Sequence, residues 1–329
     1  MRKIALFAHD AGGAEILLEL LKASLACGEF RIFCLVESPC FNLIKAKKLE
    51  QFWCEIASEK SDIEAKLASF GPDLILYGTG WQNHLEYHFL SYAKTHHLPS
   101  IAFLDHWTNY RERFGYPEQN WMNNLPTFIA AHDQTSFDKA QSLGLPNIIA
   151  IKNYALLAQL KDAQSVLEKT PETNTLLFLS EPTAKVAERS FKDAYGWGFT
   201  EKEVFEDILA NQEKFGCENI LIRLHPSDTP ETYQAIDPNA TFSHATLLED
   251  IASANVIIGI DTVALYTAYL LGKNVISYIP SSKRECLVPL PKANQLTNFE
   301  HFKLSTLEQK HQNPEDFGID FALFLEKQL

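Results

Sequence analysis

The chain lacks several patterns that would assign it to the membrane, to the secretory route or to the disulfide-rich proteins. No segment approaches the run of about 20 apolar residues that a membrane-spanning helix needs, so no integral membrane segment is expected. The start, MRKIALFAHD, is basic, but its apolar run ends at His9 and Asp10 and is too short for a secretory signal. The six cysteines form no CxxC pair. We therefore expect reduced thiols and a cytoplasmic protein, and peripheral contact with the inner face of the membrane stays open.

Positive charge and metal-binding motifs are also scarce. The chain has 42 acidic and 29 basic residues, which gives a formal net charge of -13. Such a surface repels nucleic acid, so we expect no DNA or RNA partner, and an anionic small molecule would need a locally positive pocket. The sequence contains no DxD, HxH or HExxH motif and no GxGxxG motif. We therefore expect no metal and no bound cofactor.

The chain does have a regular alternation of short apolar strands and amphipathic helices. In the first half, strands are predicted at residues 3–8, 31–37, 73–79, 100–105, 127–132 and 147–151, and helices at 14–26, 59–71, 84–97 and 134–144. A second series begins at 175, with strands at 175–180, 219–225, 256–260 and 275–279. Repeated βα units predict parallel sheets that are covered by helices on both faces.

The break between the two series predicts the domain organisation. Residues 1–155 should form one α/β domain and residues 175–310 a second, joined by a polar, proline-bearing linker at 156–174. An amphipathic helix within 311–329 closes the chain and could pack back on the first domain. The expected fold class is α/β, with two Rossmann-like domains and a cleft between them. Ligands of such sheets bind outside the carboxyl ends of the strands.

Two segments that follow predicted strands of the first domain carry candidate residues. In HDAGG (9–13), Asp10 faces a ligand, and Gly12 and Gly13 allow close approach of the backbone to it; the alternative is a simple turn. The segment after strand 100–105 is rich in aromatic and charged residues, which is typical of a binding surface. Asp105 is a candidate general base, and Arg111 and Arg113 are candidate partners of a ligand carboxylate. Trp107 and Tyr110 are candidate faces for sugar stacking, and His106 is a further candidate for binding the acceptor sugar. The alternative here is a structural corner with an Arg–Asp pair.

In the second domain the candidate residues form a phosphate clamp. His225 follows a buried strand, and Pro226 restricts its backbone and so fixes where the imidazole points. Asp261 and Thr262 end another strand just before a helix, whose amino terminus offers backbone donors to an anion. Arg223, Ser180 and Glu181 are further candidates at strand ends. The alternatives are a strand end that runs into a turn and a plain helix cap.

Residues 221–228 (LIRLHPSD) and 247–278 resemble the donor-binding half of GT-B glycosyltransferases. The resemblance is strongest to bacterial enzymes of the sialyltransferase and polysialyltransferase kind and to their capsule-synthesis relatives. In those families an HP motif and a Ser/Thr motif hold the phosphate of a CMP-sugar, and an acidic-glycine motif supplies the base. His225-Pro226 matches the HP motif, and Thr262 stands where a hydroxyl residue is expected, although the Ser/Thr pair is missing. For the base, Asp105 has the strand-end setting without a glycine, and Asp10 has the glycines but follows the first strand.

The resemblance implies a metal-independent glycosyltransferase of surface polysaccharide synthesis, for capsule or lipopolysaccharide. The donor would be a CMP-activated acidic sugar of the nonulosonic acid or Kdo type, bound by the second domain. The acceptor, a glycan or a lipid-linked glycan, would bind the first domain, with Asp105 placed ahead of Asp10 as the base. Three alternatives stay open: a CDP-glycerol-type glycerophosphotransferase, a UDP-sugar 2-epimerase and a non-catalytic nucleotide-sugar binding protein.

Overall fold

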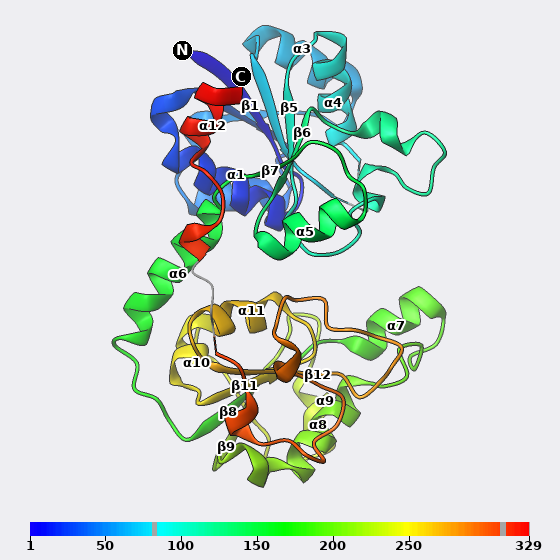
Figure 1. Cartoon of the computed structure of the whole chain (residues 1–329), viewed down its shortest axis with the longest axis vertical. Helices are drawn as coiled ribbons and strands as arrows, with labels where there is room; N and C mark the ends of the chain where they lie inside the picture. Colours follow the sequence, from blue (N-terminus) through cyan, green and yellow to red (C-terminus); the bar gives the residue numbers. More distant parts are fainter. Residues whose placement is uncertain (81–83, 310–313, 329) are drawn as a thin grey trace. The chain divides into compact units, whose positions relative to one another are not determined.

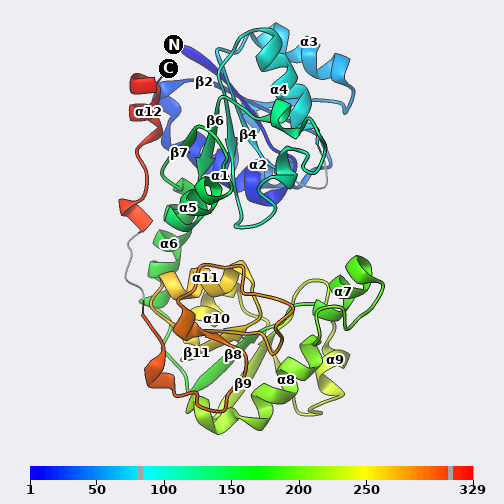
Figure 2. The same ribbon diagram turned by 45° about the vertical axis from the view of Figure 1, so that its right-hand side comes forward.

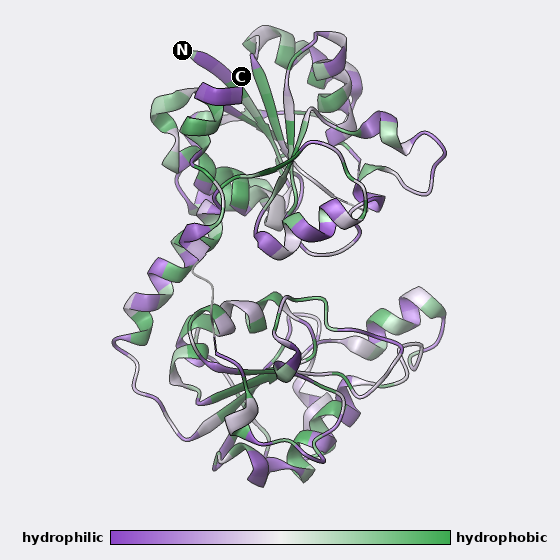
Figure 3. Cartoon of the chain, in the orientation of Figure 1, coloured by the Kyte–Doolittle hydropathy of each residue, from purple (hydrophilic) through white to green (hydrophobic). Residues whose placement is uncertain are grey.

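A computed structural model describes residues 1–80, 84–309 and 314–328, and the chain divides into two compact units. Unit 1 comprises Met1–Gln159 together with Pro314–Leu329, and unit 2 comprises Leu160–Asn313. Each unit contains a parallel sheet with helices on both faces (Figure 1, Figure 2). The strands are largely hydrophobic and the helices are amphipathic (Figure 3), as expected for sheets buried on both sides. The two α/β units confirm the predicted fold class.

Unit 1 is built on a seven-stranded sheet with the order β3-β2-β1-β4-β5-β6-β7. Its strands are β1 Arg2–Phe7, β2 Gly28–Cys34, β3 Trp53–Glu55, β4 Leu74–Gly78, β5 Ser100–Phe103, β6 Phe128–Ala131 and β7 Ile148–Ala150. Its helices are α1 Ala11–Ala23, α2 Pro39–Ala46, α3 Lys60–Phe70, α4 Glu86–Thr95, α5 Gln134–Ser142 and α12 Phe321–Gln328. Residues of α1, α2 and α12 join the hydrophobic core on one face of the sheet, and residues of α3, α4 and α5 join the core on the other.

The end of the chain belongs to unit 1. Phe321, Phe324 and Leu325 of α12 are buried in the core beside α1 and β1. The segment before α12 pairs with the segment after β7 through a parallel bridge between Ile151 and Ile319. The amphipathic pattern at 320–329 therefore marks a helix that completes the first unit.

Unit 2 is built on a six-stranded parallel sheet with the order β10-β9-β8-β11-β12-β13. Its strands are β8 Thr175–Leu179, β9 Asn219–Arg223, β10 Thr241–Phe242, β11 Val256–Gly259, β12 Asn274–Tyr278 and β13 Gln295–Leu296. Its helices are α7 Thr183–Phe191, α8 Glu201–Ala210, α9 Pro230–Gln234, α10 Leu247–Ser253 and α11 Val263–Leu270.

The segment between the two sheets is partly helical. Helix α6 runs without a break from Tyr154 to Leu167, and the boundary between the units falls inside it, after Gln159. The polar residues from Glu168 to Asn174 then lead into β8. Among the described residues, no helix is long and apolar enough to cross a membrane. All six cysteines carry free thiols.

Candidate functional site

The carboxyl edge of the unit 1 sheet gathers a set of polar side chains. The neighbouring strands β1, β4, β5 and β6 end one after another at this edge because they are parallel. The residues that follow them are Asp10 after β1, Thr79 after β4, Asp105 after β5 and His132 after β6. This is the edge at which open α/β sheets bind ligands.

Arg113 holds this edge together from the inside. Its Nη1 donates to Asp105 Oδ1 at 2.6 Å, to the Thr79 carbonyl oxygen at 2.8 Å and to Thr79 Oγ1 at 2.9 Å. Its Nε donates to the Thr108 carbonyl oxygen at 3.1 Å, and the side chain is only 4% exposed. The expectation that Arg113 pairs with a ligand carboxylate was wrong, because Asp105 and the β4 end occupy the guanidinium. The structural Arg–Asp corner is the observed arrangement.

Asp10 and Asp105 differ in their electrostatic surroundings. Asp10 caps α1, and its Oδ1 accepts a hydrogen bond from the Gly13 N–H at 3.0 Å. Burial raises the pKa of Asp10, and the nearby charge of Asp105 raises it further. Asp105 instead forms an ion pair with Arg113. A base works best when its pKa lies near the working pH and no cation holds its lone pair, so the geometry favours Asp10 over Asp105.

Gly12 and Gly13 serve the packing of α1 against this edge. A Cβ on Gly12 would lie 2.2 Å from Asp105 Oδ2, and a Cβ on Gly13 would lie 2.8 Å from the Gly78 Cα. These glycines permit a close approach to the protein's own chain, and the approach of a ligand to them stays a prediction. As a result, the Asp105 carboxylate lies against the first turn of α1, where the helix dipole stabilises negative charge.

The aromatic residues of the 105–114 loop are not available as stacking faces. Trp107 is 3% exposed and donates its Nε1–H to Asp133 Oδ2 at 2.8 Å. Tyr110 is buried, and its hydroxyl donates to Ser136 Oγ at 3.0 Å. The prediction that these two rings stack on a sugar was therefore wrong. Both rings fill the core and hold the start of α5.

Two other candidates in this loop are half-buried. His106 Nδ1 lies 3.1 Å from Thr108 Oγ1, and its ring packs edge-on against Trp107. Arg111 donates through Nε and Nη2 to the Leu143 carbonyl oxygen. Arg111 thus joins its own loop to the end of α5, and His106 remains the ring of this loop that is partly open to solvent.

Sequence reasoning missed two buried titratable residues at this edge. Glu86, in the first turn of α4, is 2% exposed and accepts a hydrogen bond from the Gly80 N–H at 3.2 Å. Burial raises its pKa to about 8, so the carboxyl is protonated at neutral pH. His132 is also buried, and burial lowers its pKa, which keeps the imidazole neutral. Neither residue stands out in the sequence, because Glu86 is one polar position of a helix and His132 ends an apolar strand.

In unit 2 the neighbouring strands β9, β8, β11 and β12 end at one edge. Ser180, just after β8, is buried and fixes the loop after β9. Its Oγ accepts from the His225 N–H at 2.9 Å and donates to Asp228 Oδ2 at 2.7 Å. Ser180 therefore positions the HP loop and does not face solvent.

His225 is oriented to donate a hydrogen bond outward. Its Nδ1 accepts a hydrogen bond from the Ser227 N–H at 3.1 Å. That contact assigns the proton of the neutral ring to Nε2. The side chain is exposed, so the Nε2–H is open to a ligand.

Thr262 caps α11 and is partly exposed. Its Oγ1 accepts from the Ala264 N–H at 3.4 Å, which is the arrangement of a helix cap. The start of α11 lies at the end of β11, two strands away from β9, and two strand spacings amount to roughly 10 Å. His225 and the start of α11 therefore both lie at the carboxyl edge of the same sheet.

Asp261 and Glu181 form an acid pair with Arg284, a residue that sequence reasoning missed. The Asp261 N–H donates to Glu181 Oε1 at 2.8 Å. Arg284 pairs with the Asp261 carboxylate through Nη2 at 2.7 Å and Nε at 3.2 Å, and its Nη2 lies 3.7 Å from Glu181 Oε2. Burial, and then the charge of Asp261, raise the pKa of Glu181 to about 8. Arg284 lies in the irregular segment after β12, where no periodicity draws attention to it.

Arg223 has a structural partner. Its Nη1 forms an ion pair with the buried Asp250 at 2.6 Å and donates to the Ala245 carbonyl oxygen at 2.9 Å. The guanidinium therefore ties the end of β9 to α10. We leave Arg223 out of the candidate donor site for this reason.

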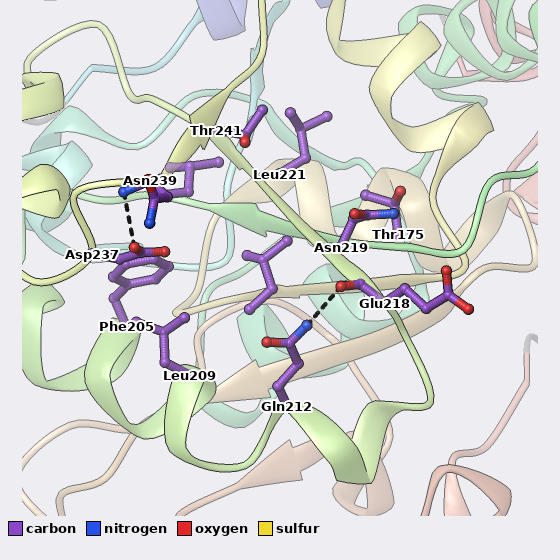
Figure 4. A pocket seen from close by; sticks show the side chains of 13 residues that line it. Thr175, Phe205, Leu209, Gln212, Glu218, Asn219, Leu221, Asp237, Asn239 and Thr241 are labelled. Atoms are coloured by element: carbon purple, nitrogen blue, oxygen red, sulfur yellow. Dashed lines mark hydrogen bonds between the residues drawn. The ribbon is translucent and has the colours of Figure 1, made fainter.

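A pocket of about 390 Å³ lies elsewhere in unit 2 (Figure 4). Thr175 and Asn219, the first residues of β8 and β9, line it together with Phe205 and Leu209 of α8. It thus lies toward the amino ends of the strands. His225, Thr262 and Arg284 follow the carboxyl ends, so this pocket is separate from the candidate donor site.

The comparisons with known proteins agree with this architecture. No protein-family model matches the chain, and no curated protein sequence matches it. Among solved structures, the MurG protein of Acinetobacter baumannii is similar, with a TM-score of 0.52, 12% identity, and 89% of this chain and 80% of that chain covered. The chain has the GT-B fold.

Two further solved structures are similar to the chain. Alr3699/HepE of Anabaena, solved in complex with UDP, has a TM-score of 0.53 and 13% identity, with 84% of this chain and 80% of that chain covered. A Listeria monocytogenes protein provisionally named UDP-N-acetylglucosamine 2-epimerase has a TM-score of 0.54 and 12% identity, with 86% and 80% covered. At these identities the likeness establishes the fold, and the function has to be argued from the residues.

Proposed function

We propose that the chain is a glycosyltransferase that transfers a sugar from a nucleotide-sugar donor to a glycan or lipid-linked acceptor. One observation carries the proposal: at the carboxyl edge of unit 2, His225 presents its Nε2–H outward, and α11, capped by Thr262, begins two strands away. Both features donate to anions, and neither requires a metal. The three similar structures described above support the proposal through the fold.

The proposed reaction is a displacement at the anomeric carbon of the donor sugar. The acceptor hydroxyl oxygen forms the new bond to that carbon, and the bond to the phosphate oxygen breaks with its electron pair on the phosphate. Asp10, in its ionised form, takes the hydroxyl proton, a contribution of about 10²–10⁴ in rate. His225, Thr262 and the start of α11 stabilise the negative charge on the leaving phosphate.

The acid pair of unit 2 makes this site compatible with an anion. Arg284 neutralises Asp261, and Glu181 keeps its proton at neutral pH because burial and Asp261 raise its pKa to about 8. The three side chains together then carry no net charge. If Glu181 were ionised they would carry a net negative charge and would repel the donor phosphate.

For the donor we propose a CMP-activated acidic sugar of the nonulosonic acid or Kdo type, used in capsule or lipopolysaccharide synthesis. The HP motif at His225-Pro226 and the hydroxyl of Thr262 support this choice through the family resemblance. The main competing donor is a UDP-sugar, because Alr3699/HepE was solved with UDP. A CDP-glycerol-type glycerophosphotransferase and a non-catalytic nucleotide-sugar binder would use the same phosphate clamp.

The second candidate function is a UDP-sugar 2-epimerase, which the similarity to the Listeria protein favours. An epimerase converts its nucleotide sugar without an acceptor, whereas a transferase needs one. Incubation of UDP-HexNAc and of CMP-sugars with and without a glycan acceptor, followed by mass analysis, separates the two. Acceptor-independent conversion of the UDP-sugar would overturn the transferase proposal.

The binding part of the proposal is tested by thermal unfolding with CMP, CDP, UMP, UDP and GDP, because a ligand of the folded state raises the unfolding temperature. We expect nucleotides of one nucleobase to give the largest rise in unfolding temperature. His225→Ala should reduce that rise and lower kcat by about 10²–10³, the loss typical of one oxyanion donor. His301→Ala, which removes an exposed histidine of the same unit, is the matched control. Normal nucleotide binding and turnover by His225→Ala would contradict the clamp.

A further inference from the structure

A second pocket, of about 250 Å³, lies on unit 1 beside the first part of the sheet. Its cationic side chains come from three elements: Lys3 from β1, Arg31 from β2 and Lys66 from α3. The apolar part of its wall includes the rings of Phe33 and Phe70, and Glu29 is the carboxylate that lines it. Lys3 and Glu29 lie opposite each other in the register of β1 and β2, near the amino ends of these strands. The pocket is therefore distinct from the carboxyl edge that holds Asp10 and Asp105.

Arg31 has no polar partner in this pocket. Its Nε is buried without a hydrogen bond, and no ion pair or hydrogen bond joins its guanidinium to any other residue that the structure describes. The guanidinium carbon lies 5.7 Å from the centre of the Phe70 ring, and Lys3 Nζ lies 5.6 Å from the same ring centre. Two cations thus converge on one ring. Buried donors in proteins are nearly always paired, so the buried Arg31 Nε–H, which has no partner and lies in a side chain beside a second cation, calls for an explanation.

Asp62 and Asp73, the carboxylates that flank the pocket, are held by hydrogen bonds, and Glu29, which lines it, forms no ion pair with Lys3, Arg31 or Lys66. Asp62 accepts from the Ala57 N–H at 2.7 Å and lies 3.3 Å from Lys66 Nζ. Asp73 accepts from the Lys3 backbone N–H at 2.8 Å. The local positive charge stands out in a chain whose formal net charge is -13. An anion from outside the chain is the partner that this arrangement lacks.

We infer that this pocket binds an oxyanion, specifically a phosphate group carried by a small molecule or by a lipid headgroup. The planar guanidinium of Arg31 presents parallel donors that match two phosphate oxygens. Lys3 supplies flanking charge, Lys66 shares its charge with Asp62, and the Phe70 ring packs against a small organic part next to the phosphate. The inference does not depend on the glycosyltransferase proposal, since it concerns other residues of another surface.

The test measures phosphate binding by the full-length protein at constant ionic strength, by calorimetric titration and by the rise in unfolding temperature. We expect Arg31→Met to lower phosphate affinity at least tenfold, because a charge-assisted pair is lost. In buffer without phosphate, we expect the unfolding temperature of Arg31→Met to equal or exceed that of the wild type, since an unpaired cation has been removed. A residue that only packed on Phe70 would give the reverse: a lower unfolding temperature and unchanged phosphate binding.

Matched variants assign the response to this pocket. Lys45→Met removes another cation that lies over a ring of unit 1, that of Phe41 at 4.5 Å, and should bind phosphate as the wild type does. Arg31→Lys keeps the charge but loses the paired donors, so it should bind with intermediate affinity. His225→Ala should keep the Arg31-dependent response, which separates it from phosphate binding at the donor site. An equal response in wild type and Arg31→Met, or an equal loss in Lys45→Met, would overturn the inference.

Two arms of the experiment distinguish the sources of the phosphate. One titrates inorganic phosphate, and the other titrates phosphatidylcholine vesicles with and without phosphatidic acid. Arg31-dependent binding to the acidic vesicles that is at least tenfold tighter per accessible phosphate than binding of inorganic phosphate identifies a lipid headgroup. Arg31-dependent binding of inorganic phosphate without that preference identifies a small phosphate ester. Arg31-independent behaviour in both arms would overturn the inference.

Discussion

The buried carboxyl of Glu86 predicts how the stability of unit 1 changes with pH. Its pKa of about 8 in the folded protein, against an ordinary value of 4.5, corresponds to about 5 kcal/mol of free energy. Because the folded-state pKa is raised, the folded protein binds more protons than the unfolded chain between these two values. The contribution of protonated Glu86 to the free energy of unfolding is therefore complete below about pH 4.5 and is lost as the pH rises through about 8.

Replacing Glu86 with Gln removes this titration and keeps the shape of the side chain. The amide oxygen of the variant can still accept the hydrogen bond from the Gly80 N–H, which is 3.2 Å long in the wild type. Between pH 5 and pH 9, the free energy of unfolding of the wild type should fall by about 4 kcal/mol relative to the variant. The two proteins should have similar stability at pH 5, and the variant should be the more stable one at pH 9.

The assay is denaturant unfolding monitored by tryptophan fluorescence across this pH range. Four of the five tryptophans belong to unit 1, and Trp197 alone belongs to unit 2, so the signal mainly reports the unit that contains Glu86. Glu118→Gln, at an exposed position of the same unit, should follow the wild-type curve. Parallel curves for wild type and Glu86→Gln over the whole range would refute the reasoning, since they would show that Glu86 ionises normally when buried.

Three further changes test other parts of the structure. Asp10→Asn should lower kcat by about 10²–10⁴ without changing donor affinity, and its rate should no longer fall at acid pH. If Asp105→Asn lowered kcat equally, and the rate of Asp10→Asn still fell at acid pH, Asp105 would be the base. Glu181→Gln should remove the weakening of donor binding that we expect in the wild type as the pH rises through about 8, measured by nucleotide titration at several pH values. Phe324→Ala should destabilise unit 1 by about 3–5 kcal/mol in denaturant unfolding, because its ring is buried between α12 and the sheet; a loss below 1 kcal/mol would show that α12 is not part of that core.

Features encoded by neighbouring residues could be predicted from the sequence. Gly71 ends α3 in a left-handed conformation, as the glycine after that helical pattern predicts. Thr200 caps α8 with a hydrogen bond from the Glu203 N–H, the arrangement that a threonine just before a helical pattern favours. The short strands β3, β10 and β13 escaped prediction because two or three residues carry no detectable period.

Features that depend on distant residues could not be predicted. Trp107 and Tyr110 looked like surface rings because loops usually lie in solvent, but Asp133 and Ser136, 26 residues further along the chain, bind them inside the core. Arg284 contacts Asp261 from 23 residues away, and the sequence of its segment shows neither strand nor helix periodicity. Only the fold brings these residues together, so composition and spacing cannot reveal the pairs.

The two units share an electrostatic arrangement at the carboxyl edges of their sheets. In unit 1, Arg113 pairs with Asp105 and leaves Asp10 as the acid whose pKa is raised by burial. In unit 2, Arg284 pairs with Asp261 and leaves Glu181, whose pKa is about 8. In each unit one guanidinium pairs with one of two neighbouring carboxyl groups, and burial raises the pKa of the other. The proposed reaction requires opposite states of these two acids, because Asp10 must lose its proton to act as a base and Glu181 must keep its proton to admit a phosphate. Activity should therefore be confined to the pH range above the pKa of Asp10 and below about 8. The loss of activity at low pH should disappear only when Asp10 is replaced, and the loss at high pH only when Glu181 is replaced.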